Sequence, residues 1–125
     1  MTMRNARFMV VLVGVLLPYA VRLPGGLAWL QQYTDQDLDG WLYFLGFNAI
    51  AWGAILAISF LYRRPVSLIA PCLLGFGCLA WAHASLDLRA DALAGIAIMF
   101  IPIYTLVPIV IGGAVGYFID RKSRR

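Results

Sequence analysis

Residues 41–86 read WLYFLGFNAIAWGAILAISFLYRRPVSLIAPCLLGFGCLAWAHASL, and this stretch decides the fold. Two apolar runs, about residues 41–62 and 66–86, flank an Arg-Arg-Pro sequence at residues 63–65. A helix needs about 20 apolar residues to cross the hydrocarbon core of a bilayer, so each run is long enough. Because basic residues resist translocation and proline interrupts a helix, the stretch predicts a transmembrane hairpin with its turn in the cytoplasm.

Two further apolar runs, about residues 8–23 and 92–119, lie on either side of this hairpin. Basic side chains flank the runs at every second connection and at both ends: Arg4, Arg7, Arg63, Arg64, Arg121, Lys122, Arg124 and Arg125. Acidic side chains occupy the other connections: Asp35, Asp37, Asp39, Asp87 and Asp91. The alternation predicts an all-α integral membrane bundle of four transmembrane helices with both ends in the cytoplasm.

The composition excludes an ordinary water-soluble domain. Hydrophobic residues make up 62% of the chain and charged residues 13%, with a mean hydropathy of +0.83, whereas soluble domains carry about a quarter charged residues. We therefore expect a single transmembrane domain over residues 1–125. The net charge of +4 comes from basic residues scattered beside apolar runs. This pattern favours anionic lipid headgroups on the cytoplasmic side over nucleic acid as partners, and no cofactor is expected.

The connection at residues 24–40 interrupts the helical pattern at Pro24-Gly25-Gly26. The following Trp29 and Tyr33 predict a short segment in the membrane interface, where both residue types are favoured. Arg22 is expected to snorkel outward from the far end of the first run. The basic start and short apolar middle of that run also fit a cleavable signal peptide, which is the rival interpretation.

The fourth run is too long for one upright span, and it contains Pro102 and Pro108. We therefore expect a kinked or tilted helix. Asp91 is expected to cap its start, and residues 120–125 are expected to form a frayed basic tail.

Three alternate acids, Asp35, Asp37 and Asp39, are followed by Gly40 and reproduce the opening of a calcium-binding loop. Such carboxylates can converge on one hard cation. The twelfth position is Gly46, however, where the pattern needs a glutamate, and the chain contains no glutamate. The favoured interpretation is a solvated acidic loop in which Asp39 caps the second helix. A weak external cation site is the alternative.

Four polar residues are expected within the membrane: Asn48, His83, Tyr104 and Thr105. Because an amide in hydrocarbon needs a partner, Asn48 is predicted to hydrogen-bond a neighbouring helix, with a substrate contact as the alternative. His83 shares an i, i+4, i+8 spacing with Asp87 and Asp91, which could hold a metal or relay a proton. The chain must turn back after Leu86, which favours a histidine without a special role.

Small residues mark candidate packing faces on three of the runs. The second run carries Gly46, Gly53 and Ala57; the third carries Ser67, Pro71, Gly75, Cys78 and Ala82; the fourth carries Gly95, Gly113 and Gly116, with Gly112 and Gly116 as a close-approach pair. Small faces let helices approach where lipid supplies no hydrophobic drive. They serve either the internal bundle or a homo-oligomer.

Two families of four-span proteins have a similar length. Small multidrug resistance transporters carry a glutamate in the first span, and the first run here has none. Fluoride channels are similar in size, and Asn48 in the second run adds to the likeness. Their glycine-rich signature lies near the N-terminus, whereas the Gly-Gly-x-x-Gly sequence here covers residues 112–116. The chain is assigned to neither family.

No acid or lysine lies in the middle of any run, although ion-coupled transport usually places an ionisable group there. Enzyme chemistry has no recognisable set of residues either. We therefore expect a non-catalytic accessory, scaffold or protective protein of a bacterial inner membrane. It would contact another membrane protein or further copies of itself. The alternative is a small oligomeric channel or carrier that uses Asn48 with Tyr104 and Thr105 of the kinked fourth helix.

Overall fold

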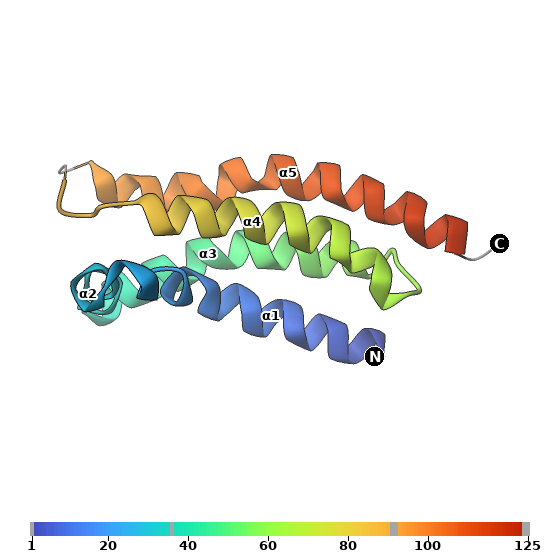
Figure 1. Cartoon of the computed structure of the whole chain (residues 1–125), viewed down its shortest axis with the longest axis horizontal. Coiled ribbons are helices and arrows are strands. Elements are labelled where there is room, and N and C mark those ends of the chain that lie inside the picture. Colours follow the sequence, from blue (N-terminus) through green and yellow to red (C-terminus); the bar gives the residue numbers. More distant parts are fainter. Residues whose placement is uncertain (1, 36, 91–92, 124–125) are drawn as a thin grey trace.

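The computed structural model describes residues 2–35, 37–90 and 93–123, and every regular element in these ranges is a helix. Four long helices lie side by side: α1 (Met3–Ala20), α3 (Leu38–Ser59), α4 (Ile69–Ser85) and α5 (Ala94–Ser123) (Figure 1). Each of them, with its short flanking turns, is long and apolar enough to cross a membrane. The prediction of an all-α, multi-pass membrane protein is confirmed at this level.

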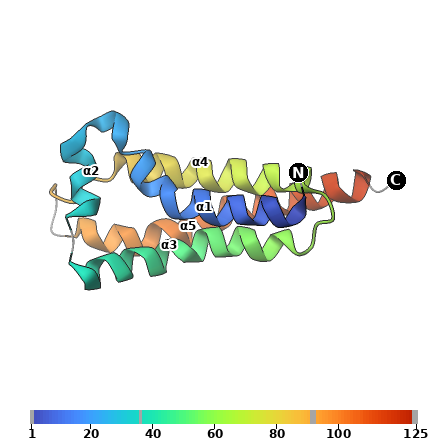
Figure 2. The ribbon, with the colours of Figure 1, turned by 90° about the horizontal axis from the view of Figure 1, so that it is seen from below.

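Three short elements connect the long helices. The 3-10 turn η1 (Leu23–Gly25) and the helix α2 (Leu27–Thr34) join α1 to α3, and the 3-10 turn η2 (Pro65–Leu68) joins α3 to α4. Gly26 separates η1 from α2 with a φ of 99°, a conformation that favours glycine. Figure 2 shows α2 at the end of the bundle opposite both chain termini. We call these two ends the α2 end and the termini end.

Local caps explain why the first two long helices begin earlier than their apolar runs. The Thr2 hydroxyl accepts a hydrogen bond from the Asn5 N–H at 3.2 Å, at the start of α1. The Asp37 carboxylate accepts one from the Gly40 N–H at 2.8 Å, at the start of α3. The expectation that Asp39 is the cap was wrong, because Asp39 lies within the first helical turn. It still complements the helix dipole there.

The last helix, α5, is continuous through Pro102 and Pro108. Both prolines remain inside one helix, as transmembrane helices tolerate when neighbouring groups satisfy the freed backbone. The expected fraying from residue 120 was wrong. The helix continues to Ser123, and Asp120 is fully buried at its inner side. The expected cap Asp91 lies outside the described residues.

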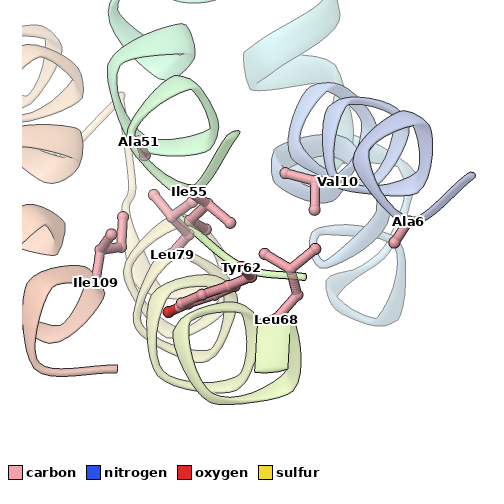
Figure 3. Close-up of a cluster of buried hydrophobic side chains, with 8 residues drawn as sticks. All are labelled: Ala6, Val10, Ala51, Ile55, Tyr62, Leu68, Leu79 and Ile109. Carbon is pink, nitrogen blue, oxygen red and sulfur yellow. The ribbon is translucent and has the colours of Figure 1, made fainter. Parts of the chain in front are cut away.

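The middle of the bundle is filled by apolar side chains from three helices. Ala51 and Ile55 of α3, Leu79 of α4 and Ile109 of α5 have no exposed surface (Figure 3). Gly75 of α4 makes room for them, because a methyl group there would lie 2.6 Å from Ile109. This layer separates a polar cluster at the α2 end from a second one at the termini end.

Candidate functional site

Arg22 is the centre of the polar cluster at the α2 end. Its side chain is fully buried, so the expectation that it snorkels outward was wrong. The guanidinium donates through Nη1 to the carbonyl oxygens of His83 at 2.7 Å and Leu86 at 2.6 Å. Nε donates to the Trp29 carbonyl at 2.8 Å, and Nη2 to the Gln32 side-chain oxygen at 3.0 Å. Hydrogen bonds to an ionised donor are about twice as strong as neutral ones, so this fork fixes the end of α4 to α2.

Two aromatic rings of α2 cover the same guanidinium. Its central carbon lies 4.4 Å from the ring centre of Trp29 and 3.9 Å from that of Tyr33. Cation–π contacts of this kind are worth about 2 kcal/mol when they are desolvated. The indole N–H of Trp29 also donates to the Ala84 carbonyl at 3.0 Å. The position of α2 is therefore set by Arg22 from one side and by the end of α4 from the other.

Gln32 extends this network to the connection between α4 and α5. Its amide nitrogen donates to Asp87 at 2.8 Å, and its oxygen also accepts from the Leu88 N–H at 2.8 Å. The same Asp87 oxygen accepts from the Arg89 N–H at 3.0 Å. Asp87 therefore orders the connection between α4 and α5 and is turned towards α2.

His83 lies directly beneath this network. Its Nδ1 lies 2.9 Å from the Tyr33 hydroxyl, and its ring packs against Phe44 with centres 5.7 Å apart. The other ring nitrogen, Nε2, is buried without a hydrogen-bond partner among the described residues. Burial raises the pKa of Tyr33 above its usual range, which keeps this hydroxyl neutral.

The metal interpretation of the His83 spacing does not fit the described part of the site. Helix α4 ends at Ser85, so Asp87 no longer shares a helical face with His83. Asp91 lies outside the described residues. No group of three histidine, cysteine or acidic side chains that could hold a metal ion is found within residues 2–35, 37–90 and 93–123.

The acidic loop has a definite structural role at one of its three positions. Asp37 caps α3, as described above. Asp35 follows the last residue of α2, and its side chain is exposed, as is that of Asp39. The weak cation site formed by these three acids remains a prediction without a supporting contact, whereas the cap is observed.

Asn48 hydrogen-bonds a neighbouring helix, as the packing interpretation predicts. Its amide nitrogen donates to the Gly14 carbonyl of α1 at 2.8 Å, and the side chain is 2% exposed. Its oxygen is buried without a partner among the described residues. Thr105 is also buried and donates to the Ile101 carbonyl of its own helix at 2.7 Å. Tyr104, in contrast, is 70% exposed on the outer surface of α5.

Asp120 is the centre of the polar cluster at the termini end, and sequence reasoning missed it. One carboxylate oxygen accepts from the backbone N–H groups of Arg63 and Arg64 and from the Ser67 hydroxyl, each at 2.9 Å. Asp120 thereby provides a hydrogen-bond acceptor for two backbone N–H groups and one hydroxyl of the turn between α3 and α4. The only sequence signal for this cluster was an acid directly after the last apolar run. That acid, Asp120, was instead predicted to belong to a frayed basic tail.

Two further contacts complete this end of the bundle. The Tyr62 hydroxyl donates to the Gly113 carbonyl at 2.6 Å, and burial, with a smaller effect of Asp120, raises the pKa of Tyr62 to about 12. Arg7 of α1 donates to the Ser59 hydroxyl at 3.0 Å and the Ser59 carbonyl at 3.2 Å. Its guanidinium also lies 4.2 Å from the Phe60 ring centre. Arg7 therefore fixes the end of α3 to α1.

Most of the small residues predicted on α4 and α5 pack within the bundle, but Gly95 is exposed and has no close neighbour among the described residues. A methyl group at Gly112 would lie 2.7 Å from the Ala70 carbonyl oxygen, and one at Gly116 would overlap the Ser67 carbonyl and the Tyr62 hydroxyl. Together with Gly75, these glycines allow close helix contact inside one chain. Gly14 of α1, which packs against the side chain of Trp52, is a further close contact that the sequence did not reveal.

The small face of α3 is different. Nothing among the described residues lies within 4 Å of a methyl group placed at Gly46 or Gly53, and Ala57 is exposed. The expectation that Gly53 marks a packing face is therefore not met inside this chain. Its face is directed away from the other helices.

The chain matches no protein-family model, no curated protein and no solved structure. Its function has to be argued from the contacts above.

Proposed function

We propose that this chain is a non-catalytic, multi-pass protein of a bacterial inner membrane, with both ends in the cytoplasm. It acts as an accessory, scaffold or protective partner and assembles through the outward small face of α3, in the first instance with a second copy of itself. The observation that supports this proposal is the contrast between the glycines of α3 and those of the other helices. Five helical glycines outside α3 have close neighbours inside the chain: Gly14, Gly75, Gly112, Gly113 and Gly116. Among the described residues Gly46 and Gly53 have none, and together with exposed Ala57 they form a continuous small face, whereas Gly77 and Gly95 stand singly on their helices.

A glycine in a transmembrane helix is costly unless a close contact with another helix requires it. Within a helix, glycine is about 1 kcal/mol less favourable than alanine. At Gly75, Gly112 and Gly116 the close contact of neighbouring helices requires it. At Gly46 and Gly53 no contact within the described part of the chain requires a glycine. Because small residues in membranes allow helix backbones to approach one another, an external helix is the partner that fits this face.

The spacing of the face suits a helix partner. Gly46, Ile50, Gly53 and Ala57 follow i, i+4, i+7 and i+11, so they lie along one side of α3. Ile50 is 38% exposed and can pack beside an approaching backbone. The same side of a second copy offers the same groove, and a two-fold pair of α3 helices is therefore self-complementary.

A channel or carrier has less support. The layer of Ala51, Ile55, Leu79 and Ile109 fills the bundle between its two polar clusters. Tyr104 is on the outer surface, so it does not face Asn48 across the interior of one chain. Ion flux through liposomes that contain the protein, abolished by Asn48→Leu, would favour this alternative.

Replacing Gly53 with leucine is expected to convert the assembled protein to a monomer. The leucine fills the side of α3 on which the second backbone lies. The internal bundle is expected to be unchanged, because a Cβ at Gly53 meets no other helix within 4 Å among the described residues. The mass of the protein in mild detergent and energy transfer between labelled copies in liposomes provide the measurement.

The matched control is Gly77→Leu on α4. Gly77 is also a helical glycine with nothing within 4 Å, but it lies outside the α3 face. This variant is expected to keep the assembled state. A monomeric parent protein, or equal loss of assembly in both variants, would contradict the proposal.

The proposed orientation is tested with single cysteines. Asp35→Cys and Arg89→Cys, at exposed positions of the α2 end, are expected to react with a membrane-impermeant maleimide in intact cells. Arg64→Cys, at the termini end, is expected to react only after the cells are opened. The parent chain with half-buried Cys72 and Cys78 is the control. Any other pattern of labelling would contradict the proposed orientation.

A further inference from the structure

Two apolar grooves flank the beginning of α4 near the termini end. The first has a volume of about 240 Å³ and lies between α1 and α4, where Val10, Val13, Pro65, Cys72 and Phe76 line it. The second, of about 380 Å³, lies between α4 and α5 and is lined by Val66, Ala70, Leu73, Val115 and Ile119. Ile69, which is 56% exposed, lines both grooves and forms the ridge between them.

The length of the first groove matches one leaflet of a bilayer. From Pro65 to Phe76 the helical rise amounts to about 16 Å. Half of a typical hydrocarbon core is about 15 Å. A fatty acyl chain that enters beside Pro65 therefore reaches the level of Phe76 at about the bilayer midplane.

Positive charge lies next to the residues at which both grooves begin. Arg63 and Arg64 directly precede Pro65 and Val66, and both side chains are exposed. The backbone N–H groups of the two arginines bond Asp120, which holds this turn in place. Asp120 is the only acid in the sequence after Asp91, and it is buried beneath the turn. The segment that leads into both grooves is therefore cationic, and we call it their rim.

We propose that this region binds one anionic diacyl phospholipid. Its two acyl chains lie in the grooves on either side of Ile69, and its phosphate contacts Arg63 and Arg64. Planar guanidinium groups suit phosphate oxygens because they donate in pairs. Two parallel apolar grooves with one cationic rim fit two acyl chains joined to one anionic headgroup, and they do not fit a soluble anion.

The test uses the whole protein in a neutral mild detergent, titrated with phosphatidylglycerol or with phosphatidylcholine of the same acyl chains. The lipid fraction that gives half of the maximal rise in unfolding temperature measures apparent affinity. Phosphatidylglycerol is expected to act at a clearly lower fraction than phosphatidylcholine. Soluble glycerol phosphate is expected to give no rise. Equal action of the two lipids, or a full effect of glycerol phosphate, would overturn the proposal.

Charge variants assign the headgroup. Each arginine near an anionic headgroup contributes about 1 kcal/mol to binding. Arg64→Gln is therefore expected to lower the apparent affinity for phosphatidylglycerol about 5-fold, and the double variant Arg63→Gln/Arg64→Gln about 30-fold. Their backbone bonds to Asp120 do not involve the side chains, so the fold is retained. Arg89→Gln, an exposed arginine at the α2 end, is the matched control and is expected to change nothing. The same loss in Arg89→Gln would show a general charge effect and refute the site.

A groove variant tests the acyl chain separately. Val13→Phe fills the end of the first groove without changing any charge. It is expected to lower the apparent affinity for both lipids several-fold. Val107→Phe, at a 62% exposed position of α5 outside both grooves, is its control. Unchanged binding in Val13→Phe would show that no chain lies in this groove.

Discussion

Replacing Arg22 with glutamine is expected to lower the free energy of unfolding by about 4 kcal/mol. The guanidinium makes four hydrogen bonds and is covered by two aromatic rings. A hydrogen bond to a charged group contributes about 1.5–3 kcal/mol, and each buried carbonyl left without a donor costs about 1–3 kcal/mol. A glutamine amide cannot reach all four acceptors. Reversible unfolding in mixed micelles, followed by circular dichroism, gives the change.

The same variant is expected to release α2 before the bundle unfolds. Chymotrypsin should then cleave after Tyr33, which is buried in the parent protein, and faster after the half-buried Trp29. Arg22→Lys keeps the charge but donates from a single point, so it is expected to recover less than half of the lost stability. Arg89→Gln, an exposed substitution at the same end, should stay within about 0.5 kcal/mol of the parent. If Arg22→Gln is equally stable, the network around Arg22 does not hold α2 in place.

Adding one methyl group at Gly116 is expected to destabilise the protein by about 3 kcal/mol. The methyl of Gly116→Ala would overlap the carbonyl oxygen of Ser67 and the hydroxyl of Tyr62. Overpacking usually costs about 1–3 kcal/mol, and the upper value applies here because a backbone carbonyl cannot rotate away as a flexible side chain can. The same unfolding measurement in micelles detects this loss.

Gly77→Ala is expected to change stability in the opposite direction. At this position the methyl meets no neighbouring helix within 4 Å in the described part of the chain, and alanine favours the helix by about 1 kcal/mol over glycine. The variant is therefore expected to be as stable as the parent or slightly more stable. If Gly116→Ala and Gly77→Ala shift stability in the same direction, close internal contact is not what distinguishes the two glycines.

Hydropathy and charge were sufficient to predict the four long helices, because each depends on residues that are contiguous in sequence. The starts of α1 and α3 lie outside the apolar runs because the caps at Thr2 and Asp37 are polar. A short separate segment was predicted around Trp29 and Tyr33, and the structure forms the helix α2 there. Its place in the membrane interface and the cytoplasmic location of the termini remain predictions.

The buried charges could not be predicted in the same way. Arg22 finds two of its acceptors 61 and 64 residues further along the chain, and Asp120 bonds a hydroxyl 53 residues before it. Hydropathy assigns both residues to water because it does not describe such distant partners. A single arginine followed by proline and an aromatic segment was the only local signal for the first of them.

Helical periodicity had a similar limit for the small faces. It grouped five small residues of the third run on one side, of which Ser67, Pro71 and Gly75 are buried. The other two, Cys78 and Ala82, are half-buried. Periodicity also grouped Gly46 and Gly53 on one side of α3, and this side is directed outward. Periodicity shows which residues share a side of a helix, whereas the direction of that side depends on the neighbouring helices.

The bond between Asp120 and the turn at residues 63–67 has a consequence for biosynthesis. The ribosome makes this turn more than fifty residues before it makes the acid that satisfies it. During that interval the hairpin of α3 and α4 can insert, but its loop keeps two amide groups that only water can solvate. The loop of the nascent hairpin therefore reaches its final hydrogen bonding only when α5 is in place.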